Sequence, residues 1–364
     1  MMPEANANDV DLLRRLCTTA GVPGREHRVR DLILGELASL PKGFLDEVRV
    51  DPMGSIVATR KGGGGDDAER IMIATHMDQI GFLVRYIDQA KGWLRLQPVG
   101  GFDPRNLFAR RARVCPDVAD PSKDLPAVMN PGVKPLHVST PEDRKKVPEI
   151  EEFYLDLGLP AEQVAERVKI GDMVVLDANL SEVGNAVVSQ ALDNRIACCV
   201  ALETLKALAG SPDQRPNGDL IFVFTVQEEV GLRGALATTS TIQPTVGIAL
   251  DTTLCIDTPG VPDEQQCTVA GAGVGLKVMD SSAIANFELF NDVIAVAEQN
   301  DIPHQRAVMP RGGTDAGGMQ RQAGGVRTLT LAVPTRYIHT VTEMIHHTDW
   351  AAARTLLTAY CRGV

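Results

Sequence analysis

Residues 70–78 read RIMIATHMD, an apolar run that ends at a histidine and an aspartate. Runs of this kind are typical of strands buried within a parallel-rich sheet. Two further runs share the form, because 219–227 (DLIFVFTVQ) precedes two glutamates and 245–251 (TVGIALD) ends at an aspartate. Around them we predict helices at 9–40, 191–209, 231–239, 283–300 and 343–360, and strands at 47–60 and 327–333. Strands that alternate with helices predict an α/β/α sandwich with a mixed central sheet.

A different pattern occupies residues 83–180. Short alternating stretches such as FLVRYID and GDMVVLDA are separated by Gly, Pro and Asp, which is typical of a small β-barrel or sandwich. We therefore predict one catalytic domain formed by 1–82 and 181–364, into which 83–180 is inserted. The stretch KGGGGDD at 61–67 lacks the Lys-Ser or Lys-Thr of a phosphate-binding loop, and we predict a hairpin loop there.

The composition excludes several classes of protein. The 364 residues carry a net charge of −11, which argues against binding to the phosphate backbone of a nucleic acid. No apolar run approaches the ~20 residues of a membrane span, and the N-terminus lacks the basic-then-apolar order of a signal peptide. We therefore expect a cytoplasmic protein with no membrane partner. The seven cysteines include no C-x-x-C pair, which argues against a disulfide framework or a cysteine zinc site.

Ligand-type side chains gather where the predicted strands end. The carboxyl ends of parallel strands meet at one edge of a sheet, so we expect His76, Glu229 and Asp251 to lie close together. Asp193 joins them from the turn that opens the helix at 191–209, and His339 follows the strand-like LTLAVPTRYI. Each residue alone has an ordinary structural explanation, such as helix capping by Asp193. Burying all five without a metal, however, would cost several kcal/mol of unpaired desolvation.

This set of groups predicts the class of metal and of reaction. Two imidazoles, three carboxylates and no thiolate suit Zn, Co or Mn. Five ligands are more than one ion needs, and they suit two divalent ions about 3.5–4 Å apart with one bridging carboxylate. The neighbouring Glu228 is then free to take a proton from water and to return it to a leaving nitrogen. The sequence therefore predicts a hydrolase of C–N bonds with two metal ions per subunit.

Six motifs carry a resemblance to a known family. In chain order they are THMDQIGF (75–82), ALDNRIACC (191–199), VFTVQEEVGLRGA (223–235), ALDTT (249–253), RGGTDAGG (311–318) and PTRYIHT (334–340). Their order and spacing resemble those of the tetrahedral-aminopeptidase family. Its members are cobalt- or zinc-dependent metallopeptidases also labelled glutamyl aminopeptidases. The resemblance covers nearly the whole chain.

The resemblance implies a role for each site residue. Asp193 would bridge the two ions, with His76 and Asp251 completing one site and Glu229 and His339 completing the other. Glu228 would be the general acid/base, and Asp78 would orient His76. The resemblance also implies a cis peptide bond between Asp193 and Asn194.

Further positions near the site bear on the substrate. Gln79 stands where the family usually has Glu, and Thr252 stands where an apolar residue is common. Thr314 and Asp315 lie in the glycine-rich stretch RGGTDAGG. A purely structural explanation of that stretch is a turn whose glycines adopt positive φ. We predict that Gln79, Thr314 and Asp315 contact the substrate.

The leading prediction is an aminopeptidase that releases N-terminal residues from short peptides. The alternative keeps the metal site and acts as an aminohydrolase or amidohydrolase on a small non-peptide substrate. That substrate would be an acylated amine, a lactam or an activated aromatic amine such as a nitroanthranilate. The resemblance further implies that the insertion is a β-barrel that mediates dimers, from which a larger homo-oligomer is built. A glycosidase would have no role for the two histidines, and a serine hydrolase would need a G-x-S-x-G motif.

Overall fold

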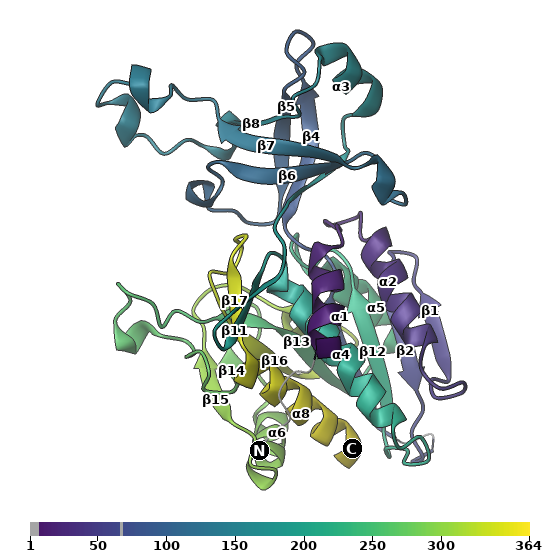
Figure 1. The fold of residues 1–364 in the computed structure, drawn as a ribbon. Helices are drawn as coiled ribbons and strands as arrows, with labels where there is room; N and C mark the ends of the chain where they lie inside the picture. Colours follow the sequence, from purple (N-terminus) through teal and green to yellow (C-terminus); the bar gives the residue numbers. More distant parts are fainter. Residues whose placement is uncertain (1–6, 66–67) are drawn as a thin grey trace.

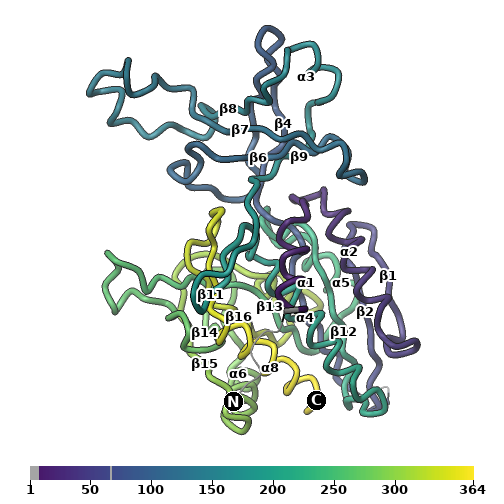
Figure 2. The backbone as a smooth tube through the Cα atoms, viewed as in Figure 1, coloured from purple at the N-terminus to yellow at the C-terminus, as the bar shows by residue number. Residues whose placement is uncertain are grey.

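The computed structural model describes residues 7–65 and 68–364. Within these ranges the chain forms a large α/β sandwich and a small β-barrel, which stands above the sandwich in Figure 1. The tube in Figure 2 shows that the chain leaves the sandwich, completes the barrel and returns. The predicted α/β fold with a mixed sheet and an inserted barrel is therefore confirmed. No helix in the described ranges is long and apolar enough to cross a membrane.

The large sheet contains eleven strands within the described residues. Its centre is parallel, because β12, β3, β13 and β16 run in one direction, and its two edges are antiparallel. A side branch is formed by β14 and β15, of which β14 pairs with β16. In spatial order the main path is β1 (Glu47–Val50), β2 (Ile56–Arg60), β12 (Asp219–Thr225), β3 (Arg70–His76), β13 (Val246–Leu254), β16 (Arg327–Arg336), β17 (Glu343–His346), β11 (Ala186–Ser189) and β10 (Ser181–Val183), with β14 (Val274–Met279) and β15 (His304–Val308) at the side.

Both faces of the central strands are buried. Successive residues of a strand point to opposite faces, so on β3 Ile71 and Ile73 join the larger core while Met72 and Ala74 join the smaller one. This double burial explains why the strand is apolar throughout. The larger core is covered by α1 (Ala7–Thr18), α2 (His27–Ala38), α4 (Leu192–Ala209), α6 (Phe287–Gln299) and α8 (His347–Gly363), and the smaller by α5 (Arg233–Ile242) and α7 (Asp315–Gln320).

The barrel is closed by six short strands and has a core of its own. Phe82, Leu94 and Phe153 are fully buried members of that core. Around the barrel the strands are β4 (Gly81–Ile87), β5 (Leu94–Val99), β8 (Phe153–Asp156), β7 (Leu125–Pro131), β6 (Arg110–Cys115) and β9 (Met173–Leu176), and α3 (Ala161–Arg167) precedes β9. The predicted domain limits at 82 and 181 stay a prediction.

Two local predictions are wrong. The helix predicted at 343–360 begins only at His347, because Glu343–His346 form β17. Alternate residues of EMIH are buried, which is the period of a strand rather than of a helix. The hairpin predicted at 61–67 is absent as well, since β12 lies between β2 and β3 and pairs with both. Residues 66–67 of that stretch lie outside the described residues.

Candidate metal centre

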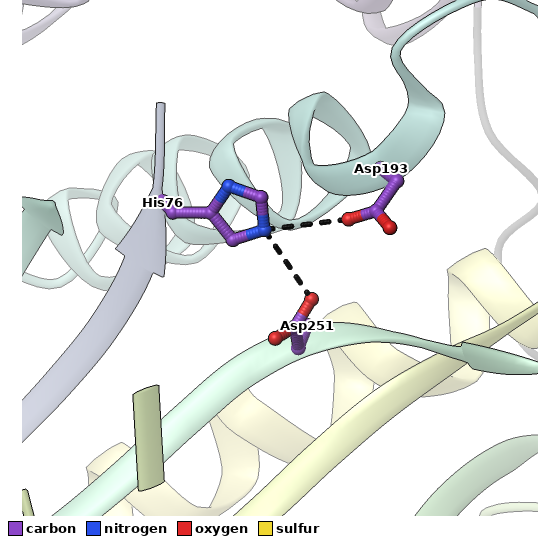
Figure 3. A group of neighbouring side chains, drawn as sticks. All are labelled: His76, Asp193 and Asp251. Carbon is purple, nitrogen blue, oxygen red and sulfur yellow. Dashed lines mark ion pairs between the residues drawn. The ribbon is translucent and has the colours of Figure 1, made fainter. Parts of the chain in front are cut away.

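The candidate centre lies at the carboxyl edge of the parallel strands. His76 is the last residue of β3, and Asp251 lies on the neighbouring strand β13. The pairing of these two strands stops at Ala74 and Ala249, so β13 has already left β3 when it reaches Asp251. Asp193 approaches the same place from the first turn of α4 (Figure 3). The divergence of the strands leaves room for side chains between them, which a fully paired ladder would not.

One triad consists of His76, Asp193 and Asp251, drawn in Figure 3. Nε2 of His76 lies 3.3 Å from Oδ1 of Asp193 and 3.7 Å from Oδ1 of Asp251. Ligand atoms placed tetrahedrally about 2.0–2.1 Å from a zinc ion are roughly 3.4 Å from one another. The spacing therefore suits three groups that face one cation.

The second triad consists of Asp193, Glu229 and His339. Nε2 of His339 lies 3.6 Å from Oδ2 of Asp193 and 3.4 Å from Oε2 of Glu229. Asp193 thus presents Oδ1 to one triad and Oδ2 to the other, as a carboxylate bridging two ions would. Oε1 of Glu229 is buried and has no hydrogen-bond partner among the described residues, so it is a free acceptor for a cation. The Asp193–Asn194 peptide bond is cis.

Asp78 holds both His76 and the turn that carries the two glutamates. Its Oδ1 accepts a hydrogen bond from the backbone N–H of Glu228 at 3.0 Å, and its Oδ2 accepts one from that of Glu229 at 3.1 Å. Oδ1 also lies 3.6 Å from Nδ1 of His76, and the same ring nitrogen lies 3.1 Å from the carbonyl oxygen of Asp78. One buried carboxylate therefore fixes an imidazole and a turn together.

Glu228 faces the first triad without belonging to either triad. Its Oε2 lies 3.8 Å from Nε2 of His76. Burial raises the pKa of Glu228 well above its ordinary value, against the opposing effect of His76. A carboxyl group with a raised pKa can donate a proton as well as accept one, which a general acid/base requires.

A second carboxylate, which the sequence pattern did not predict, supports the candidate centre. Glu343 accepts a hydrogen bond from the backbone N–H of His339 at 2.8 Å and another from that of Asp193 at 3.0 Å. Its side chain is buried, and burial raises its pKa to about 8. The helix predicted at 343–360 concealed this role, because a glutamate in the first turn of a helix is expected to face solvent. The alternating pattern of EMIH is the signal that could have revealed it.

The electrostatics of the cluster favour a cation. Burial raises the pKa of Glu229 to about 8. Burial also works to lower the pKa of His339, but the carboxylates of Asp193 and Glu229 outweigh it and raise that pKa to about 10. Burial works to raise the pKa of Asp193, yet the two histidines hold it below its usual range. Buried carboxylates that depend on nearby positive charge, with nitrogen and oxygen donors only, fit a divalent metal ion.

The three positions predicted to contact the substrate are hydrogen-bonded to other residues of the protein. Gln79 is buried, and its Oε1 accepts a hydrogen bond from Arg195 at 3.3 Å. Thr314 is hydrogen-bonded to a threonine of β16, and Asp315 to a threonine of β12. None of the three lines the cavity described next. Their contact with substrate stays a prediction.

A cavity of about 480 Å³ opens over both triads. Its lining includes the candidate ligands and Glu228, and also residues of β14 and of the loops at 281–282 and 309–313. The volume is in the range of ordinary small-molecule sites, so it suits a substrate the size of one or two amino-acid residues.

Comparisons with known proteins agree along nearly the whole chain. The family model described as M42 glutamyl aminopeptidase matches residues 54–356. The lysyl aminopeptidase of Pyrococcus furiosus is 32% identical over 349 residues, covering 94% of this chain and 93% of that protein. The glutamyl aminopeptidase of Lactococcus lactis is 31% identical over 353 residues, covering 96% and 94%. Among solved structures, the TET1 peptidase of Pyrococcus horikoshii, which can assemble into a tetrahedron or a large octahedral shell, matches with a TM-score of 0.84 at 30% identity, covering 97% of this chain and 99% of that chain.

Proposed function

The chain belongs to the M42 glutamyl aminopeptidase family and is a metal-dependent aminopeptidase, and we propose that it releases N-terminal residues from short peptides at the two triads. The observation that carries this assignment is the position of Asp193, whose two carboxylate oxygens face different triads. A single structural ion would not need a carboxylate whose two oxygens face two different groups of ligands. Names among the relatives include both lysyl and glutamyl aminopeptidases, so membership leaves the preferred N-terminal residue open.

The residues present fit two divalent ions, one in each triad, and Zn, Co and Mn all suit their donors. Ions bound there would polarise the scissile carbonyl and lower the pKa of a shared water. His76 and Asp251 would hold one ion, His339 and Glu229 the other, and Asp193 both. Asp78 and Glu343 keep these ligands in place through the hydrogen bonds described above.

Glu228 is the proposed acid/base. It lies beside the first triad, and its raised pKa suits transfer of a proton in both directions. It takes a proton from the attacking water as the oxygen bonds to the carbonyl carbon. When the C–N bond breaks, the same proton passes from Glu228 to the leaving amine, so the carboxylate is restored. Hydrolysis then yields a free amino acid and a shortened peptide.

Metal analysis combined with one substitution tests the assignment. We expect purified protein to contain about two divalent ions per chain. Glu228→Gln should keep those ions and lose about 10²- to 10⁴-fold in kcat, the usual contribution of a general acid/base. Glu162→Gln, an exposed position on α3, is the matched control and should retain full turnover. Full activity of Glu228→Gln, or active protein with no bound metal, would refute the proposal.

The non-peptide alternative is not favoured, because the named relatives are aminopeptidases. A panel of aminoacyl anilides and dipeptides, run beside lactams, acylated amines and nitroanthranilates, separates the two functions. We expect turnover with the peptide-like amides. Turnover confined to the second set would replace the aminopeptidase assignment while leaving the metal centre intact.

We also propose that the chain forms a homo-oligomer built from dimers through its barrel. The segment 132–150 of the barrel exposes Leu136 and Val138, each about two thirds exposed, together with Val147. The ability of the TET1 peptidase to form closed shells supports assembly of this chain too. Leu136→Asp combined with Val138→Asp should reduce the mass measured by light scattering, whereas Ile170→Asp, also exposed on the barrel, should not. An unchanged mass in the double variant would exclude this segment as the contact.

A further inference from the structure

The turn that carries Glu228 and Glu229 follows β12 and is supported by a second buried carboxylate besides Asp78. Three consecutive backbone N–H groups of this turn donate to carboxylate oxygens. Asp78 accepts those of Glu228 and Glu229, as described above. The first of the three, that of Gln227, donates to Oε1 of Glu26 at 3.1 Å. Glu26 is 5% exposed and lies in the connection between α1 and α2, so the turn is held from two separate parts of the chain.

The backbone of Gln227 needs this support. Its φ is 56°, in the left-handed region that residues other than glycine rarely adopt. Such a conformation persists where the surrounding structure holds it in place. The N–H of Gln227 is held by Glu26, and its carbonyl oxygen accepts a hydrogen bond from the backbone N–H of Arg233 at 3.2 Å. Because Gln227 directly precedes Glu228, its backbone angles set the direction in which Glu228 points.

Glu26 serves this turn rather than its own helix. It directly precedes α2, where the helix dipole favours a carboxylate, yet its side chain makes no capping hydrogen bond to α2. Its Oε1 accepts instead the backbone N–H of Gly24 at 2.8 Å together with that of Gln227. Gly24 is also left-handed, with a φ of 76°. One oxygen therefore holds two left-handed residues, one in each of two chain segments.

The connection that carries Glu26 is itself fixed to the surroundings of the candidate centre. The carbonyl oxygen of Gly21 accepts a hydrogen bond from the backbone N–H of Gln79 at 3.0 Å and one from the guanidinium of Arg195 at 3.3 Å. Arg195 is fully buried and also donates to the carbonyl oxygens of Leu16 and Thr19 at the end of α1. Gln79 belongs to the segment that follows β3, and Arg195 belongs to the first turns of α4. Glu26 is therefore held on a rigid base, as a residue that positions another must be.

We propose that Glu26 is a positioning residue for the acid/base, because it holds Gln227 in the left-handed conformation that directs Glu228 to the first triad. The inference rests on the proposed aminopeptidase function, with Glu228 as its acid/base. Glu26 takes no part in the chemistry and acts through the backbone of Gln227. What matters is an oxygen acceptor at the reach of a glutamate side chain, and the charge is secondary.

Three substitutions of Glu26 separate reach from charge. Glu26→Gln keeps a carbonyl oxygen that can accept both N–H groups, and it should keep most of kcat. Glu26→Asp keeps the charge but withdraws the acceptor by one methylene group, and Glu26→Ala removes the acceptor. Both should lose about 10- to 100-fold in kcat, since a small misplacement of a catalytic group is costly, with KM and metal content unchanged. Steady-state kinetics on a dipeptide and metal analysis of each variant make the comparison.

A matched control removes a similar buried carboxylate elsewhere. Asp349 on α8 is fully buried and accepts the backbone N–H groups of Gly271 and Gly273 at 2.8 and 2.7 Å. Asp349→Ala therefore leaves two backbone N–H groups without their acceptor, as Glu26→Ala does. It should lower the melting temperature and leave kcat unchanged.

A double-mutant cycle with Glu228 shows whether Glu26 acts through the acid/base. In protein that already carries Glu228→Gln, the further change Glu26→Ala should reduce kcat hardly at all, because a missing acid/base cannot be misplaced. A substitution that weakened the fold or metal binding would reduce kcat by the same factor in both backgrounds.

Three outcomes overturn the role of Glu26. They are a wild-type kcat in Glu26→Asp, a loss of equal size with and without Glu228→Gln, and a loss of kcat that follows a loss of bound metal. If Glu26→Ala does not fold, Glu26→Asp replaces it in the cycle. Full activity of Glu228→Gln, or failure of metal-loaded wild-type protein to hydrolyse any peptide, would instead overturn the proposed function.

Discussion

The two triads of the candidate centre contain similar groups in different settings. His76 ends a central strand of the sheet and its side chain is 2% exposed. His339 lies in the connection between β16 and β17, at a positive φ of 64°, and its side chain is 33% exposed. In the first triad, His76 and Asp251 are held by the hydrogen-bond ladder of the sheet. In the second, His339 is held by one buried carboxylate, Glu343, which accepts hydrogen bonds from the backbone of both His339 and Asp193.

Similar candidate ligands are thus held in place in two ways, by strands of the sheet and by a side chain that binds a connection. A strand within a sheet is fixed by neighbours on both sides, so its side chains are preorganised. A connection outside the sheet, such as the one that carries His339, opens at a lower free energy than the core. We therefore expect the position beside His76 to hold its metal more tightly than the position beside His339.

Removal of the shared ligand should have the largest effect. Asp193→Asn keeps the shape of the side chain and removes the charge that both triads use. We expect kcat/KM to fall on the order of a thousandfold or more, since several kcal/mol of charge stabilisation depend on the metals. Metal analysis should find both positions depleted. Loss of only one ion per chain would contradict the bridging role.

Gradual removal of metal tests directly whether the two positions differ in metal affinity. Titration of the loaded protein with a chelator should release one ion per chain before the other. His339→Ala should retain about one tightly held ion, whereas His76→Ala should retain at most one weakly held ion. Release of both ions in a single step from wild-type protein would show that the two positions are equivalent.

The two carboxylates that support the ligands, Glu343 and Asp78, can each be replaced by the corresponding amide. Glu343→Gln can accept only one of its two backbone N–H groups, so the position beside His339 should lose about 10- to 100-fold in metal affinity. Asp78→Asn should instead weaken both positions, because Asp78 contacts His76 and also accepts the backbone N–H of Glu229. Competition with a chelating dye measures both affinities. Equal losses at both positions in both variants would remove the distinction between the two supports.

Glu203 is a buried acid outside the candidate centre, so it shows how burial alters a pKa where no candidate metal ligand is involved. Glu203 lies on α4, the same helix as Asp193, and accepts a hydrogen bond from Trp350 at 3.0 Å. Burial raises its pKa to about 8, so the folded chain keeps a proton that the unfolded chain releases near pH 4.5. Folding is therefore penalised increasingly between those two values as the pH rises.

Glu203→Gln should thus stabilise the protein by roughly 1–3 kcal/mol at pH 8.5 and hardly at all at pH 4.5. The kcat/KM should not change. Thermal melting at the two pH values, with an activity assay, makes the comparison. A variant that is less stable at pH 8.5 would show that the Glu203 carboxylate is satisfied in its charged form.

The sequence predicted the fold and the place of the candidate centre because both depend on strand pattern. Apolar runs such as 70–76 mark strands buried on both faces, and parallel strands must end at one edge. That rule was enough to bring His76, Glu229 and Asp251 together. Their role as metal ligands stays a prediction, as does that of Glu228 as acid/base.

The remaining features depend on tertiary contacts that no local pattern contains. Glu343 was missed because a short strand of four residues was absorbed into the following helix. The side strands β14 and β15 were not predicted at all, so the sequence did not place β14 beside the cavity. Gln79 was expected at the substrate from its nearness to Asp78. Its Oε1 accepts a hydrogen bond from Arg195, and its contact with the substrate stays a prediction.

The barrel joins the sandwich beside the candidate centre. Residues 77–80 separate His76 from the first barrel strand, and the chain returns through β10 and β11 to Asp193. These two residues are 117 positions apart (193 − 76), yet their side chains lie 3.3 Å from each other. In the proposed oligomer, a force applied to the barrel would act first on residues 77–80, which include Asp78, and on the segment that leads to Asp193. Assembly and the geometry of the candidate centre would then be coupled through the same short connections.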